Sequence, residues 1–522
     1  MSRIHLAQFF SRAAGLFPDQ KAIRFESREQ TWRELNTATE ELAGGLRRLG
    51  VSAGDRVAIL ALNSDRYVAF FVGIWRLSAA VVPINTRWSK DEIAYALRDS
   101  QASILVVDDA FAGLVEGLQA ENRGLTVIHM GDAATPANAV SYSVLRRDVS
   151  PVTALGGGGE EMAGIFYTGG TTGHPKGAML CHTSLVATLL AGKLGDDDAE
   201  GNVAILGVLP MFHLAGAQLS VASAMAGRQL IMHPTFDPGA IIDSIVEDRI
   251  DTLSLVPAMW AMLIDHPKAQ GADLSSLRNA LYGASPMPEG TLRRLIARLP
   301  QARFAQGYGQ TETAGVCTLL GPADHEPDGP HAQRLKSAGQ PILFSELRIL
   351  DDNGQDLPRG SVGEIAIRSA GNMLGYWNRP EETAATLKDG WIMSGDAGYM
   401  DSDGYLFIVD RTKDMIVTGG ENVYSAETES ALSMHPDVAE CAVIGVPDDK
   451  WGERVHAIVR PVAGAQASAD DLIAHCKARI AGYKCPQSIE FRILPFPISA
   501  AGKVLKRELR APYWAAADRN VN

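Results

Sequence analysis

The chain has 522 residues, of which 46% are hydrophobic and 21% are charged, and its formal net charge is −13 at pH 7. A chain of this length is too long for a single hydrophobic core and should divide into several domains. The composition is that of an ordered globular protein, and the acidic balance argues against a nucleic-acid scaffold, which would carry clustered basic residues.

The N-terminus has too short an apolar run for a secretory signal peptide, and the most membrane-like segment, residues 67–84, contains Arg76. A buried helix that leads into a strand explains this segment better than a membrane span, so no transmembrane segment is expected. The cysteines are scattered and lack CxxC spacing: Cys181, Cys317, Cys441, Cys476 and Cys485. This pattern predicts reduced thiols in a cytoplasmic protein and neither a disulfide framework nor a zinc site. A homodimer is left open.

Strand-like and helical patterns alternate over the first four hundred residues. Short, apolar, β-branched runs predict strands at 56–62, 103–107, 203–209, 252–256 and 278–282. Amphipathic helical stretches lie between such runs, for example at 238–248 and 288–299. The alternation is typical of an α/β architecture with largely parallel sheets.

The pattern changes after about residue 340. Shorter strands at 346–350, 363–368 and 405–409 predict a more antiparallel, barrel-like subdomain. The chain then restarts as a compact α+β unit, with helices expected at 426–434 and 470–480 and strands at 440–446, 454–460 and 489–494. We therefore expect a large N-terminal domain, 1–411, followed by a small mobile C-terminal domain, 412–522.

The most informative segment follows a predicted strand at 162–166 and runs Tyr-Thr-Gly-Gly-Thr-Thr-Gly-His-Pro-Lys-Gly from 167 to 177. Its glycines, threonines and lysine offer backbone N–H groups, hydroxyls and one positive charge, which are the groups that wrap a polyphosphate. A flexible surface loop is the plain alternative, and the glycines at 156–159 just before it predict a flexible connector. A Walker A loop does not fit, because Lys176 follows Pro175 and precedes Gly177.

This loop resembles the phosphate-binding signature of the adenylate-forming superfamily, which includes acyl-CoA synthetases, adenylation domains of peptide synthetases and beetle luciferases. The family usually has Ser where this chain has Gly169, so the hydroxyl contacts fall to Thr168, Thr171 and Thr172. The resemblance implies contacts to ATP from Thr168, Gly169, Gly170, Thr171, Thr172, Gly173 and Lys176. Thr168 and Lys176 would also act in catalysis.

Two further segments resemble the family's nucleotide site. In Gly-Tyr-Gly-Gln-Thr-Glu, residues 307–312, the match implies that Tyr308 stacks on adenine and Thr311 touches the α-phosphate. Glu312 would coordinate Mg²⁺, a hard cation that prefers carboxylate oxygen. Gly307 and Gly309 belong to the same segment. The opposite wall of the adenine slot would be Gly283, Ala284 and Ser285.

Segments 391–396 and 409–411 resemble the pair that holds the ribose, with Asp396 accepting hydroxyl protons and Arg411 reaching a ribose or phosphate oxygen. Lys413 falls at the family's hinge position. The resemblance assigns Gly419 and Gly420 to the pantetheine arm of coenzyme A, and a plain glycine turn is the alternative.

Segment 497–507 resembles the one that bears the catalytic lysine, here Lys503, although the family more often has a basic residue or Thr near Ser499. A point charge on a turn suits a transition state in which negative charge builds on a carboxylate and an α-phosphate. The alternative is one lysine of a basic tail that also holds Lys506, Arg507 and Arg510.

Segment 209–216 resembles the motif whose His, here His213, lies beside the substrate carboxylate; a core histidine is the alternative. The substrate pocket is expected among His213, Met259, Trp260, Gly283, Gly307, Ala314 and Gly315. Small residues leave room and Met259 and Trp260 add apolar bulk, which suits an apolar tail.

Taken over residues 10 to 510, the resemblance implies an ATP-dependent carboxylic acid–CoA ligase that forms acyl-AMP and then acyl-CoA, with ATP, Mg²⁺ and CoA as cofactors and co-substrates. A medium- or long-chain fatty acid is the favoured substrate, and an aryl acid is the alternative. Three rivals stay open: a luciferase-type oxygenase, an acyl-AMP ligase that loads a carrier protein, and a non-catalytic adenylate-binding regulator. The regulator would lose Glu312 or Lys503, and both residues are present.

Overall fold

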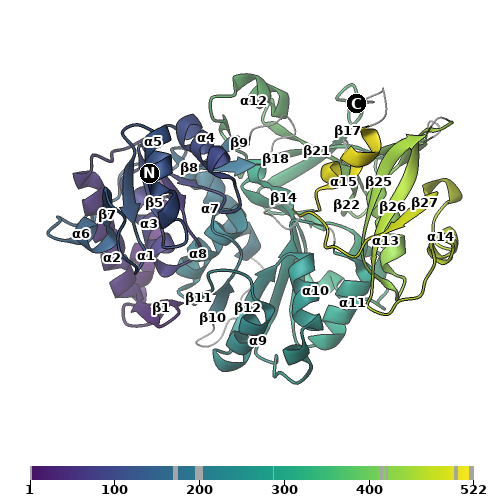
Figure 1. Ribbon diagram of the computed structural model, residues 1–522, viewed down its shortest axis with the longest axis horizontal. Coiled ribbons are helices and arrows are strands. Elements are labelled where there is room, and N and C mark those ends of the chain that lie inside the picture. The colour runs from purple at the N-terminus through teal and green to yellow at the C-terminus, as the bar shows by residue number, and fades with distance from the viewer. Residues whose placement is uncertain are drawn as a thin grey trace.

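The computed structural model describes residues 3–168, 175–193, 204–285, 287–411, 415–418, 421–448, 450–498 and 504–515. Within these residues the strands form sheets of eight, nine, five and five strands. The two larger sheets and the first five-stranded sheet make up the body of the protein, and the last sheet belongs to the C-terminal part (Figure 1). The mixed α/β architecture predicted from the sequence is confirmed.

The eight-stranded sheet has the order β19-β9-β8-β4-β3-β5-β6-β7. Its strands are β3 (Arg56–Leu60), β4 (Ala80–Pro83), β5 (Ile104–Val107), β6 (Thr126–His129), β7 (Ala139–Ser141), β8 (Met162–Thr168), β9 (Lys176–Cys181) and β19 (Gly375–Tyr376). From β7 to β8 all neighbours are parallel, whereas β8, β9 and β19 pair antiparallel.

The nine-stranded sheet has the order β16-β15-β14-β13-β12-β10-β11-β1-β2. Its strands are β1 (Lys21–Phe25), β2 (Arg28–Thr31), β10 (Ala204–Gly207), β11 (Gln229–Met232), β12 (Ile250–Leu255), β13 (Asn279–Gly283), β14 (Arg303–Gln310), β15 (Gly315–Leu320) and β16 (Gln340–Pro341). The central strands are parallel and both edges are antiparallel.

Successive residues of a strand face opposite sides of its sheet, so each large sheet has an inner and an outer face. The inner faces of the two large sheets share one core. On β3, Val57 and Ile59 face the largest core, whereas Ala58 and Leu60 pack against the outer helices. The helices of the largest core are α1 (Leu6–Leu16), α2 (Trp32–Arg48), α3 (Asp65–Arg76), α7 (His182–Lys193) and α8 (Leu214–Ala226). The outer helices are α4 (Lys90–Ser100) and α5 (Val115–Glu121) on the first sheet, and α9 (Pro238–Glu247), α10 (Pro257–Asp265) and α11 (Glu289–Arg298) on the second. The short α6 (Tyr142–Arg146) follows β7.

The segment at 67–84 is a buried helix, α3, that leads into strand β4, as expected. Among the described helices, none is long and apolar enough to cross a bilayer. One expectation is wrong: the glycines at 156–159 are not a free connector. Gly159 N–H donates to the Ile4 carbonyl (2.7 Å), and Ser78 Oγ donates to the Gly156 carbonyl (2.7 Å).

The remaining two sheets lie after residue 340. The antiparallel one contains β17 (Ser345–Leu350), β18 (Gly363–Ser369), β20 (Leu387–Lys388), β21 (Trp391–Met400) and β22 (Leu406–Arg411), with α12 (Pro380–Thr386) beside it. The C-terminal part contains β23 (Ile416–Thr418), β24 (Glu421–Val423), β25 (Val438–Asp448), β26 (Gly452–Pro461), β27 (Ser488–Phe491), α13 (Ser425–Ser433), α14 (Ala469–Lys477) and α15 (Lys506–Trp514).

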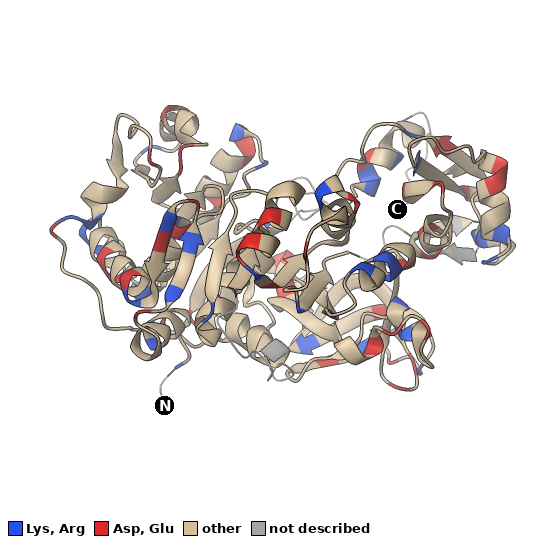
Figure 2. Ribbon diagram, turned by 90° about the horizontal axis from the view of Figure 1, so that it is seen from below, with Lys and Arg blue, Asp and Glu red and all other residues tan. Residues whose placement is uncertain are grey.

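The C-terminal part has hydrophobic clusters of its own. We therefore propose to retain the division into domains 1–411 and 412–522. Basic and acidic residues are interspersed over the helices of both parts (Figure 2).

Candidate functional site

The strands on either side of the predicted phosphate loop, β8 and β9, pair antiparallel as a hairpin. Thr168 and Lys176 face each other in register at the end of this hairpin, and Thr168 Oγ1 donates to the Lys176 carbonyl (3.5 Å). Residues 169–174 between them lie outside the described residues, so the roles predicted for Gly169, Gly170, Thr171, Thr172 and Gly173 stay predictions. The hairpin fixes where the loop begins and ends.

The side chain of Tyr376 contacts both this hairpin and Glu312, the predicted metal ligand. The Lys176 ammonium lies 5.3 Å from the centroid of the Tyr376 ring, and Tyr376 Oη donates to Glu312 Oε1 at 2.7 Å. Burial and the nearby Glu312 carboxylate raise the pKa of Tyr376, so its phenol remains a hydrogen-bond donor. Sequence reasoning missed Tyr376, and only the pairing of β19 with β9 brings it here.

Glu312 is suited to hold a divalent cation. Its side chain is buried within the short 3₁₀ helix Thr311–Thr313, and its second oxygen, Oε2, takes no hydrogen bond from any described residue. Within the described ranges, no group of three or more His, Cys, Asp or Glu side chains is placed to hold a metal. A Mg²⁺ ion at Glu312 would therefore take its other ligands from phosphate oxygens and water, which is how this ion is commonly held.

The residues predicted for adenine and ribose meet at the junction of two sheets. Tyr308 on β14 donates from Oη to Asp396 Oδ2 on β21 (2.8 Å). Burial and that carboxylate raise the pKa of Tyr308 well above its usual value, so the phenol stays neutral. Asp396 pairs in register with Arg411 on β22, although the Arg411 side chain is outside the described part of the structure.

Close backbone packing explains the glycines of this region. A Cβ at Gly283 would lie 2.3 Å from the Gly307 carbonyl oxygen, and one at Gly309 would lie 1.8 Å from the Gly315 carbonyl oxygen. Neither position could hold a larger residue without moving a strand. Just after β13, Ala284 takes a left-handed backbone conformation (φ 67°), so the chain turns sharply before Ser285.

His213 stands at the start of α8, and its loop is held by Asn63 from the segment that joins β3 to α3. Asn63 Nδ2 donates to the Leu209 carbonyl (3.0 Å), and the Met211 N–H donates to Asn63 Oδ1 (2.8 Å). The ring of Phe212 lies 4.5 Å from the His213 ring. Asn63 had no motif to mark it, yet it sets the position of the loop that carries His213.

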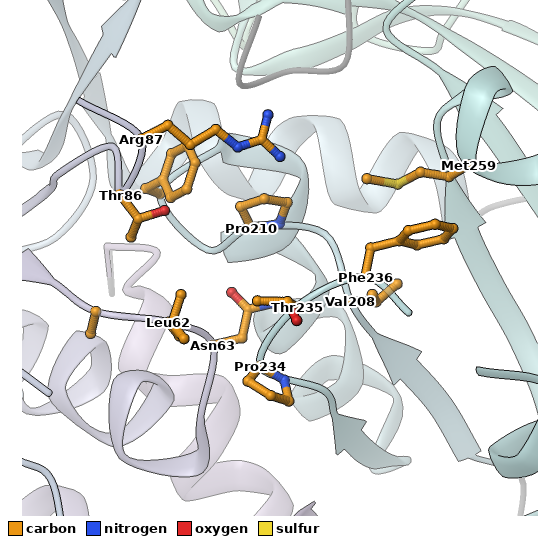
Figure 3. A pocket seen from close by; sticks show the side chains of 12 residues that line it. Leu62, Asn63, Thr86, Arg87, Val208, Pro210, Pro234, Thr235, Phe236 and Met259 are labelled. Carbon is orange, nitrogen blue, oxygen red and sulfur yellow. The ribbon is translucent and has the colours of Figure 1, made fainter. Parts of the chain in front are cut away.

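A cavity of about 80 Å³ opens beside this loop, where strands of both large sheets end (Figure 3). It is lined by Ala61, Leu62, Asn63, Thr86, Arg87, Val208, Pro210, Phe212, Pro234, Thr235, Phe236 and Met259. Most of the lining residues are apolar, and Arg87 contributes one guanidinium group to the lining. Of the residues predicted for the substrate, Met259 lines this cavity.

Trp260, the other residue of this segment predicted for the substrate pocket, does not line this cavity. Its side chain is 1% exposed, and its Nε1 donates to the Leu281 carbonyl (2.9 Å). Trp260 therefore packs in the core between α10 and the sheet, because neighbouring positions on a helix point in different directions. Ala314 is also fully buried.

The remaining predicted residues, Lys413, Gly419, Gly420 and Lys503, lie outside the described residues, and their roles stay predictions. Two basic residues near Lys503 do have partners in the C-terminal part. Lys506 forms an ion pair with Glu429 (2.7 Å), and Arg510 pairs with Glu453. These two side chains therefore fasten α15 to the domain.

Comparison with known proteins agrees with the resemblance to the adenylate-forming superfamily. The sequence pattern of the family described as AMP-binding enzyme matches residues 10–377, and that of the AMP-binding enzyme C-terminal domain matches residues 427–503. The fatty acid–acyl-carrier-protein ligase ScoC of Streptomyces coeruleorubidus is 37% identical over the whole of both chains. A feruloyl-CoA synthase of an Amycolatopsis species is 38% identical, over 96% of this chain and 97% of its own. A solved fatty acyl CoA synthetase of Mycobacterium tuberculosis is 34% identical with a TM-score of 0.75, covering 98% of each chain.

Proposed function

Because this chain belongs to the AMP-binding enzyme family, we propose that it is an ATP-dependent ligase that joins a carboxylic acid to the thiol of coenzyme A through an acyl-AMP intermediate. The observation that carries the proposal is the contact of Lys176 with Tyr376 and of Tyr376 with Glu312. These two contacts hold the Lys176 ammonium and the Glu312 carboxylate, the proposed cation ligand, on either side of one tyrosine, an arrangement that suits a polyphosphate with its metal.

In the first half-reaction an oxygen of the acid attacks the α-phosphorus of ATP. The new bond joins that oxygen to phosphorus, and the bond to pyrophosphate breaks. Lys176 and the hydroxyl of Thr168 position the phosphates, and Lys503 offsets the negative charge that builds on them. A Mg²⁺ ion held by Glu312 would supply further neutralisation of that charge.

In the second half-reaction the thiol of CoA attacks the acyl carbon and AMP leaves. We propose that the C-terminal domain turns about Lys413 between the two steps, so that Lys503 withdraws and the face with Gly419 and Gly420 approaches the acyl group. Family resemblance supports this motion.

The favoured acid is a medium- or long-chain fatty acid, and the alternative is an aryl acid. Two relatives of nearly equal identity are named for a fatty acid and for ferulate, so the names support both. Loading of a carrier protein instead of CoA is the second candidate function, and it is favoured by the name of the fatty acid relative. A cytoplasmic location is supported by the five cysteines, which are all free thiols.

The proposal is tested with purified protein, Mg-ATP and a panel of aliphatic and aryl acids. We expect acid-dependent release of pyrophosphate, followed by an acyl thioester when CoA is added. A parallel reaction with a phosphopantetheinylated carrier protein compares the two acceptors. Absence of pyrophosphate with every acid would refute the proposal, and faster transfer to the carrier protein would favour the second candidate.

Replacing Asp396 with Asn should weaken ATP binding about ten- to hundredfold, because a charged hydrogen-bond acceptor for the ribose is worth roughly 1.5–3 kcal/mol. The Asn side chain can still accept the hydroxyl of Tyr308, so the junction should keep its shape. Calorimetric titration with ATP measures the affinity, and Asp389→Asn, at an exposed turn position, is the control. Unchanged affinity in Asp396→Asn would remove this residue from the site.

A further inference from the structure

Helix α15 begins at Lys506, three residues after Lys503 in the sequence. The chain before the helix is fastened at two points, because Ile498 and Val504 form an isolated antiparallel bridge. Residues 499–503 lie outside the described residues, and the bridge holds together the two positions that flank them. The first turn of α15 and the segment that contains Lys503 are thus joined directly through Val504.

The Lys506 ammonium ties the start of α15 to two other elements. It pairs with Glu429 Oε1 on α13 at 2.7 Å and donates to the hydroxyl of Ser425, the first residue of the same helix. The same Glu429 oxygen accepts the Val443 N–H of β25 (2.7 Å). The side chains of Lys506 and Glu429 are only 17% and 24% exposed. A charge-assisted contact to a carboxylate that the sheet itself holds leaves the ammonium little freedom.

The rest of α15 has anchors that do not depend on Lys506. Arg510 pairs with Glu453, and Trp514 Nε1 donates to a backbone carbonyl of β25 (3.0 Å). Leu509 is buried in a hydrophobic cluster of the C-terminal part. Loss of the Lys506 ammonium should therefore loosen the first turn of the helix, while the remainder of the helix stays packed.

We propose that Lys506 is a positioning residue for Lys503, and that it acts by holding the first turn of α15 against α13. The inference rests on the proposed function, in which Lys503 acts in the first half-reaction only. A charge that stabilises a transition state must be placed accurately, and a displacement of about 1 Å can cost on the order of 100-fold in rate. Lys506 thus controls the rate of acyl-AMP formation through the placement of Lys503.

The second half-reaction provides a comparison within the same domain. In that step the face with Gly419 and Gly420 approaches the acyl group, and Lys503 has withdrawn. If Lys506 only kept the domain folded, both half-reactions would need it. If Lys506 positions Lys503, the first half-reaction alone needs it.

The test measures the rates of pyrophosphate release and of thioester formation from supplied acyl-AMP in Lys506→Met. At saturating ATP the first rate should fall about tenfold, with a KM for ATP within about threefold of the native value, and the second rate should stay near native. Lys506→Arg, which keeps the positive charge, should retain most of the native rate. Glu429→Gln, which removes the partner charge from α13, should reproduce the selective loss. Lys477→Met, at an exposed position of the same domain, is the matched control.

A double-variant cycle links the effect to Lys503. Adding Lys506→Met to Lys503→Ala should lower the remaining rate of pyrophosphate release by less than about twofold, because two changes that act through one group do not add. The same cycle is measured with Glu429→Gln in place of Lys506→Met, so the question is answered even if Lys506→Met fails to fold.

Four results would overturn the inference. They are a native rate of pyrophosphate release in a folded Lys506→Met protein, equal losses in both half-reactions, additive losses in the cycle, and a Lys506→Arg variant as slow as the Met variant. If the native protein releases no pyrophosphate with any acid, the proposed function fails instead, so the two failures are distinguishable.

Discussion

A Lys503→Ala variant is expected to form acyl-AMP on the order of 10²–10³-fold more slowly than the native protein, the usual loss when one group that stabilises developing charge is removed. Thioester formation from acyl-AMP supplied with CoA should stay close to the native rate, because the lysine acts only in the first half-reaction. Rapid-quench measurements of pyrophosphate release and of thioester formation separate the two steps.

Lys477→Ala is the matched control, since it removes a lysine from an exposed position of the same domain. Lys506 would be a poor control because its ion pair with Glu429 holds α15 in place. Equal losses in both half-reactions of Lys503→Ala would show that the lysine supports the structure and takes no part in the chemistry.

Replacing Glu312 with Gln should lower the rate of pyrophosphate release about 100-fold and raise the Mg²⁺ concentration needed for half-maximal rate, because the cation loses its anionic protein ligand. The Gln side chain can still accept a hydrogen bond from the Tyr376 hydroxyl. The loss of rate therefore reports on the charge of residue 312 and not on its packing. Titrating the initial rate with Mg²⁺ at fixed ATP measures both effects.

Tyr376→Phe is the companion variant. It removes the hydroxyl that donates a hydrogen bond to Glu312 but keeps the ring that contacts Lys176. We expect the rate of pyrophosphate release to fall roughly tenfold and to respond more weakly to Mg²⁺. Glu381→Gln, an exposed charge change on α12, is the control. A Glu312→Gln protein with native Mg²⁺ dependence would exclude Glu312 as the cation ligand.

Residue pattern alone predicted the α/β class and most of the strands, because apolar runs and helical periodicity are local properties of a chain. The stretch at 67–84 is an example: Arg76 argued against a membrane span, and the segment forms a helix and a strand. The motifs likewise placed Glu312 and Asp396 among the candidate residues, since their residue types match the expected chemistry.

Contacts between distant segments could not be predicted in this way. Tyr376 reaches Glu312 only because a two-residue strand joins the hairpin of β8 and β9, and Asn63 holds the loop before His213 from the distant segment between β3 and α3. Nor could the sequence tell which of Met259 and Trp260 faces a cavity, since both lie on α10 and only packing decides which side of that helix is buried. Local sequence thus determined the elements and the chemical groups, and the tertiary structure decided which of those groups meet, because strand pairing and helix packing depend on residues far apart in the chain.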